Sequence, residues 1–179
     1  MDLLVIWNQK VSLTSLDDTM DILQRHFGES MFGSIKVRIV HGRLADVGSG
    51  AGFPGVALKI VRPLLDVLLI EPNAKKAAFL AEVIRRLNLN GAEVFRGRAE
   101  EISPESGQFQ FVTARAFGDY EGLLRWSEVV LARPGKVVLW VGADQVAGLV
   151  SRPRWRWSDP IPVPVSRKRV ILVGQGEEG

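Results

Sequence analysis

The sequence predicts an α/β fold with a seven-stranded, mostly parallel sheet and a small N-terminal helical cap. From residue 44 onward, short apolar runs alternate with amphipathic segments, a pattern typical of a parallel sheet covered on both faces. The first apolar run leads into a glycine-rich turn and then a helix, as in nucleotide-binding sheets. With 179 residues, 46% of them hydrophobic, the chain is expected to form a single domain around one core.

The N-terminal cap is predicted to comprise residues 1–33, and the Rossmann-like core residues 34–179. Apolar residues at helical spacing predict one helix over residues 2–11 and a second over about 17–32, which Gly33 ends. The apolar face of the second helix is formed by Met20, Leu23, Phe27 and Met31.

Polar residues around the second helix predict how it starts and what its histidine does. Ser15 followed by Asp18 approximates a capping box. His26 is expected to be a surface or half-buried residue without a catalytic role, because no acid or nucleophile is spaced to partner it.

The core is predicted from the order of its strands and helices. Strands are expected at 44–47, 67–70, 93–96, 109–114 and 136–141, with two more within 155–173; helices are expected at 54–61, 74–89 and 120–131. Alternation over residues 154–157 directs both tryptophans toward the core and leaves both arginines exposed. The polar residues 174–179 are expected to fray.

The glycine-rich turn after the first strand predicts a binding site. Gly48, Gly50 and Gly52 give the turn little side-chain bulk, and Pro54 suits a first helical turn because it has no N–H to lose. Such a turn lets a ligand lie against bare backbone in the positive field of a helix N-terminus. We therefore predict a nucleotide-type pocket that includes Gly48 and Gly50; an ordinary glycine-rich connection is the alternative.

Two carboxylates at strand ends bear on the choice of cofactor. Residues 50–55 also have the G-x-G-x-x-G spacing of dinucleotide sites, so an NAD-dependent oxidoreductase is one alternative. Asp46 would repel a pyrophosphate but suits the amino and sulfonium groups of S-adenosylmethionine. Glu71 can accept hydrogen bonds from the ribose hydroxyls of either cofactor. Asp46 therefore favours S-adenosylmethionine and a class I (Rossmann-like) methyltransferase fold.

The ends of the third and fourth strands supply further candidate residues. The backbone at Ala99 and Glu100 is placed to bond an adenine edge, unless Glu100 and Glu101 only favour the next helix start. Arg115 lies at the carboxyl end of the sheet, where it can bind the cofactor carboxylate or RNA; a surface salt bridge is the alternative.

The composition excludes several classes of site. There is no cysteine, so disulfides, cysteine metal sites and thiol nucleophiles are excluded, and a cytoplasmic location is expected. Neither histidine has acids at ligand spacing, and no metal site is expected. No apolar run approaches the ~18 residues that span a bilayer, and no membrane partner is expected. Residues 151–170 hold six basic side chains against one acidic, which favours a nucleic-acid partner as much as a solvated face.

Several motifs in this order resemble the RsmG (GidB) family of bacterial small-subunit ribosomal RNA methyltransferases. They are WN (7–8), LTS (13–15), RHFGES (25–30), DVGSGAGFPG (46–55), RAEE (98–101) and RAF (115–117). The resemblance implies a class I methyltransferase sheet with one antiparallel strand near the C-terminus. It also implies methylation of guanine N7 in ribosomal RNA or the small subunit, with S-adenosylmethionine as methyl donor. Matching positions implies cofactor contacts from Gly48, Phe53, Ala99, Glu100 and Arg115. No catalytic residue is implied, because guanine N7 carries no proton.

Three departures from the family pattern concern the substrate side. The chain begins almost at Trp7, Val141 replaces a usual lysine, and Glu29 replaces a usual aspartate. We expect these changes to lie on the RNA side of the site. They leave open a second alternative, an RNA-binding relative that holds the cofactor without transferring its methyl group or acts on another substrate. The sequence does not predict the oligomeric state.

Overall fold

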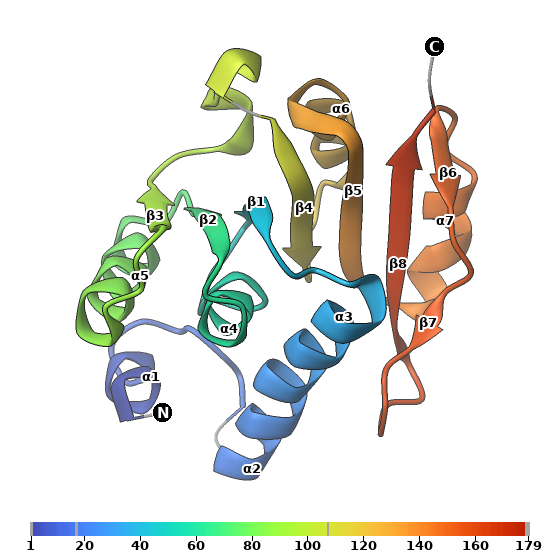
Figure 1. The fold of residues 1–179 in the computed structure, drawn as a ribbon. Helices are drawn as coiled ribbons and strands as arrows, with labels where there is room; N and C mark the ends of the chain where they lie inside the picture. The colour runs from blue at the N-terminus through green and yellow to red at the C-terminus, as the bar shows by residue number, and fades with distance from the viewer. Residues whose placement is uncertain (1, 17, 107, 178–179) are drawn as a thin grey trace.

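The computed structural model describes residues 2–16, 18–106 and 108–177, and Figure 1 shows an α/β protein built on one central sheet. The strands are β1 (Gly42–Val47), β2 (Leu65–Ile70), β3 (Ala92–Phe95), β4 (Phe109–Arg115), β5 (Leu131–Gly142), β6 (Trp155–Trp157), β7 (Ile161–Pro162) and β8 (Arg169–Gly176). Their order is β3-β2-β1-β4-β5-β8-β6, and β7 also pairs with β8.

The direction of the strands confirms the predicted mostly parallel sheet. Strands β3, β2, β1, β4 and β5 are mutually parallel, whereas β8 is antiparallel to β5. The seven-strand path has an eighth member, the two-residue β7, which is too short for a periodic signal. The predicted frayed tail is wrong for Gly174 to Gly176, because these residues pair with β6 within β8. Trp155 is buried and Arg156 exposed, as predicted.

Helices cover both faces of the sheet. The α-helices are α1 (Asp2–Asn8), α2 (Thr19–Ile22), α3 (Glu29–Val37), α4 (Gly55–Val61), α5 (Ala74–Leu87), α6 (Tyr120–Val130) and α7 (Val146–Val150). Short 3₁₀ turns are η2 (Ala99–Glu101), η3 (Pro104–Ser106) and η4 (Ala143–Gln145). One apolar cluster packs the five helices from α1 through α5 against one face of the sheet. A second cluster packs α6 and α7 against the other face (Figure 1).

The second cap helix is longer than predicted and packs through a different face. Residues 19–37 are helical throughout, because a π-helix, η1 (Leu23–Gly28), joins α2 to α3. The helix therefore continues past Gly33. Its start is capped by the Asp18 carboxylate, which accepts from the N–H groups of Met20 and Asp21, so Ser15 is not the cap.

The buried face of this helix contains small and polar residues besides the apolar Ile22 and Val37. Ser30, Gly33 and Ser34 are buried against the sheet, whereas the predicted apolar face is largely open: Met20 is 69% exposed and Met31 41%. Gly33 permits the contact, because a Cβ at this position would lie 2.3 Å from Cζ2 of Trp140 in β5.

No helix within residues 2–16, 18–106 and 108–177 has both the length and the apolar character needed to cross a bilayer.

Candidate functional site

The glycine-rich turn lies at the carboxyl edge of the sheet, between β1 and α4. Gly48, Gly50 and Gly52 have φ values of +71°, +54° and +89°, a region that side chains strongly disfavour. A Cβ on Gly48 would lie 3.0 Å from the Phe117 ring. The Gly48 N–H donates to the Ile70 carbonyl of β2 at 2.9 Å, which fixes the turn against the neighbouring strand. The turn thus presents ordered, bare backbone.

The Asp46 carboxylate fixes this turn by hydrogen bonds. It is buried at the end of β1, where Oδ1 accepts from Oγ1 of Thr113 (2.8 Å) and Oδ2 accepts from the N–H of Gly55 (3.1 Å) at the start of α4. Burial raises the pKa of Asp46 to about 6, against the lowering effect of these hydrogen bonds. The carboxylate therefore orders the turn, and its contact with a cofactor amino group stays a prediction.

Glu71 fixes the same turn from the neighbouring strand β2. It is buried at the end of β2, where Oε2 accepts from the N–H of Gly50 (2.9 Å) and Oε1 accepts from the N–H of Asn73 (2.8 Å). Each carboxylate oxygen has a second acceptor site. Glu71 can therefore hold the turn and still accept a hydroxyl group.

The cap contributes an aromatic contact that the sequence reasoning missed. The His26 ring stacks on Phe53 with centroids 4.7 Å apart, and Phe27 meets Phe53 edge-on at 4.8 Å. The His26 Nε2 lies 2.8 Å from Oγ1 of Thr14. Burial, reinforced by the positive charge of Arg115, lowers the pKa of His26 to about 4. A half-buried His26 was predicted, but not its place beside a predicted cofactor residue.

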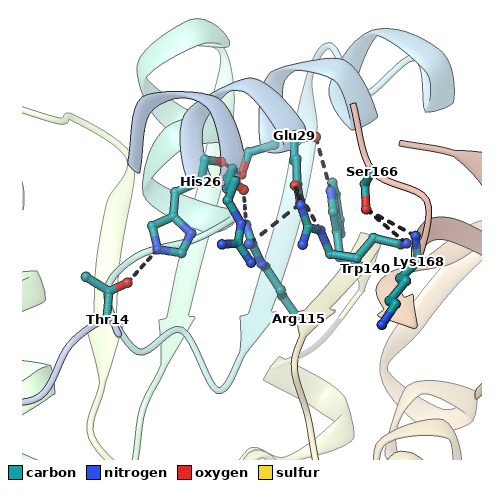
Figure 2. A network of polar contacts seen from close by, with 10 residues as sticks. Thr14, His26, Glu29, Arg115, Trp140, Ser166 and Lys168 are labelled. Atoms are coloured by element: carbon teal, nitrogen blue, oxygen red, sulfur yellow. Dashed lines mark hydrogen bonds and ion pairs between the residues drawn. The ribbon is translucent and has the colours of Figure 1, made fainter. Parts of the chain in front are cut away.

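Arg115 joins the end of β4 to the cap, as Figure 2 shows. Its Nη1 donates to the carbonyl of Arg25 (2.8 Å), and Nη2 lies 3.6 Å from Oε2 of the buried Glu29. The other Glu29 oxygen accepts from Nε of Arg169 (2.9 Å) at the start of β8. Burial lowers the pKa of Arg115, and Glu29 opposes this effect. The Glu29 carboxylate thus lies between two arginines from different strands.

The remaining predicted residues lie nearby with less defined roles. Ala99 is buried in η2, after β3, and Glu100 is exposed beside it; a contact between either residue and the cofactor stays a prediction. Val141 is buried in the apolar cluster that faces α6 and α7, so the expectation that it lies on an RNA-facing surface is wrong. Among the residues that the structure describes, no group of three or more His, Asp or Glu side chains is placed to hold a metal ion.

Comparison with known sequences finds a family model and relatives that share one description. Residues 1–155 match the family model GidB, described as rRNA small subunit methyltransferase G. The chain is 36% identical over 168 residues to a ribosomal RNA small subunit methyltransferase G of Xanthomonas campestris, covering 92% of this chain and 77% of that protein. It is 35% identical over 179 residues to the protein of that name from Xylella fastidiosa, covering 97% and 82%.

Comparison with solved structures confirms the fold. A SAM dependent methyltransferase from Aquifex aeolicus superposes with a TM-score of 0.75 at 15% identity, over 93% of this chain and 97% of that one. A precorrin-6y C5,15-methyltransferase from Geobacter metallireducens gives 0.66 at 13% identity, over 83% and 87%. At these identities the likeness shows the class I methyltransferase fold alone.

Proposed function

The chain belongs to the GidB family, rRNA small subunit methyltransferase G, and we propose that it methylates guanine N7 of small-subunit ribosomal RNA in the cytoplasm. The methyl donor in this proposal is S-adenosylmethionine. The observation that carries it is the glycine turn, which Asp46 and Glu71 fix by hydrogen bonds at the carboxyl edge of the sheet. Family membership also argues against the NAD-dependent oxidoreductase.

The residues present fit an adenosyl cofactor. In the proposal, the free acceptor sites of Glu71 bind the ribose hydroxyls, and the backbone of Gly48 and Gly50 lies against the cofactor. Ala99 and Glu100 lie beyond the end of β3, on the side expected for adenine. Asp46 contributes negative charge near the amino group, and Arg115 is the partner for the carboxylate.

The chemistry asks little of acids and bases. When bound, the sulfonium of S-adenosylmethionine supplies an electrophilic methyl group. Guanine N7 has a free lone pair and no proton, so the protein need not remove one. The low pKa of His26 keeps its imidazole neutral at pH 7, which avoids a positive charge beside Phe53. The protein's contribution is then to hold the base and the donor in line.

Transfer of tritium from labelled S-adenosylmethionine tests the proposal. Small subunits from cells that lack the native modification should gain label, and mass mapping should place it at N7 of a single guanosine. The Glu71→Ala variant should lose most of this transfer. If the protein binds S-adenosylhomocysteine in a calorimeter but labels neither ribosomal RNA nor subunits, the non-catalytic alternative replaces the proposal. If the calorimeter shows heat of binding for NADH and not for S-adenosylhomocysteine, the NAD-dependent oxidoreductase is favoured.

A further inference from the structure

A hollow lies next to the network of Figure 2, between the π-helix η1 and the loop that joins β7 to β8. Its volume is about 430 Å³, within the usual range of ligand sites. The lining residues are Asp21, Gln24, Arg25, Glu29, Pro164, Val165, Ser166, Arg167, Lys168 and Arg169. None of the residues proposed to bind the cofactor lines it.

The hollow lies at the same edge of the sheet as the glycine turn. Strand β8 runs antiparallel, so its first residue, Arg169, pairs with Gly142 at the carboxyl end of β5. In turn, Trp140 of β5 pairs with Arg115 of β4. The loop before β8 is therefore two strands from Arg115, and Glu29 connects the two through its contacts with Arg115 and Arg169.

The charge of the hollow is mainly positive. Arg167 and Lys168 are exposed, and among the described residues no carboxylate lies within ion-pair distance of them or of Arg25. The two acidic residues differ. Glu29 is balanced by Arg169 and Arg115, whereas Asp21 is exposed in α2 and opposes the field.

The loop is held in an arched shape. Val165 has φ +61°, rare for a β-branched residue, although its side chain is 86% exposed. Oγ of Ser166 accepts from the N–H of Arg169 at 3.2 Å, which leaves its hydroxyl hydrogen free to donate. Opposite the loop, Arg25 comes from a π-helix, a feature often found at functional sites. The strained backbone of Val165 persists because the surrounding structure enforces it.

We propose that this hollow binds a backbone phosphate of the RNA substrate, next to the guanine that is methylated. The inference rests on the proposed function. Arg167, Lys168 and Arg25 neutralise the phosphate, and the Ser166 hydroxyl donates to it. A phosphate held here orients the RNA strand toward the carboxyl end of β4, where Arg115 and the glycine turn lie.

Binding of a fluorescein-labelled transcript of small-subunit ribosomal RNA, measured over a series of KCl concentrations, tests the inference. The Arg167→Ala/Lys168→Ala variant should bind about tenfold more weakly. The plot of log K against log salt should become less steep by about 1, because one phosphate contact is lost. The matched control is Arg133→Ala/Lys136→Ala, which removes the same charge near the amino end of β5. Its slope should equal that of the wild type, and Asp21→Asn should bind about twofold more tightly.

Equal losses in the two double variants would assign the effect to overall charge and overturn the inference. The assay needs no methyl transfer, so the two proposals fail separately. A protein that binds RNA through the hollow without methylating it refutes only the function. A protein that methylates RNA, with the same KM for RNA in the Arg167→Ala/Lys168→Ala variant, refutes only the hollow.

Discussion

At the scale of single residues, the two acidic candidates at the glycine turn accept hydrogen bonds from groups of the protein itself. Asp46 accepts from the N–H of Gly55 after the turn and Glu71 from that of Gly50 within it, so the two carboxylates fix the turn at two points. A buried carboxylate that accepts such bonds is costly to replace, because its partners then lose their acceptor. Cofactor affinity should therefore depend on both residues even where contact is indirect.

Asp46→Asn tests this dependence. The amide oxygen can still accept from Thr113, but the amide NH₂ then faces the N–H of Gly55, and the turn loosens. We expect affinity for S-adenosylhomocysteine to fall about tenfold, or about 1.4 kcal/mol, in a calorimetric titration. Asp159→Asn, on an exposed loop, is the control and should bind as the wild type does. An unchanged affinity in Asp46→Asn would contradict the bracing role.

The sequence predicted the residues of the turn better than their partners. Asp46, Glu71 and the glycines are marked by position, since each lies at or just after the carboxyl end of a strand in a parallel sheet. The contact between His26 and Phe53 and the contact between Glu29 and Arg169 join residues far apart in the chain. No local pattern encodes such pairs, so they become visible only once the cap is placed on the sheet.

At the scale of elements, the helix over residues 19–37 shows why hydrophobic periodicity misled. Its buried face contains Ser30, Gly33 and Ser34, which let the helix approach Trp140 closely and carry little apolar signal. The π-helical turn in η1 also changes the residue spacing within the helix, so one 3.6-residue pattern cannot describe both halves.

Gly33→Ala should therefore destabilise the protein. The added Cβ would meet the Trp140 ring at 2.3 Å and Ile171 at 3.0 Å, and relief requires the helix to move off the sheet. We expect a loss of about 2 kcal/mol in the free energy of unfolding, measured by urea denaturation. Gly148→Ala is the control: its Cβ meets nothing within 4 Å, so α7 should be unchanged or slightly stabilised. Equal stability of the two variants would argue against the close approach.

Glu29 is the second link between this helix and the sheet. Glu29→Gln leaves Arg115 and Arg169 close together without the carboxylate that balances them. We expect a loss of about 3 kcal/mol in the free energy of unfolding, because one partner of a buried ionic cluster is removed. Glu121→Gln removes an exposed carboxylate that also pairs with two arginines, and should change stability by about 0.5 kcal/mol at most. Similar values for both variants would show that the buried cluster contributes little.

At the scale of the whole molecule, the alternation of strands and helices was sufficient to predict the class of fold, whereas the antiparallel strand was implied only by the family resemblance. What it could not give was the assignment of the last segment, where β6, β7 and β8 are separated by prolines and bends. Gly174 to Gly176 have no apolar side chains, and only backbone pairing with β6 places them in the sheet.

Asp46 and His26 should give opposing pH effects on stability. The Asp46 carboxyl has its pKa raised to about 6, so the folded state takes up its proton first and gains stability as the pH falls through 6. The His26 imidazole has its pKa lowered to about 4, so the unfolded chain takes up its proton first and the folded state loses stability as the pH falls below 6.5.

Urea denaturation at pH 7, 6 and 5 separates the two effects. Relative to the wild type, His26→Gln should become more stable toward pH 5 by about 1 kcal/mol, a value reduced because the ring is partly exposed. Asp46→Asn should become less stable over the same interval by about 1 kcal/mol. Two differences of the same sign, or none, would contradict these pKa values.

The order of strands also bears on how the chain is made. Strand β8 emerges after β5 and β6 during translation, yet it lies between them in the sheet. Until the ribosome has released residues 169–176, β6 has no neighbour and β5 keeps an open edge. That side of the sheet can therefore close only after β8 has been synthesised, and the same strand brings Arg169 to Glu29.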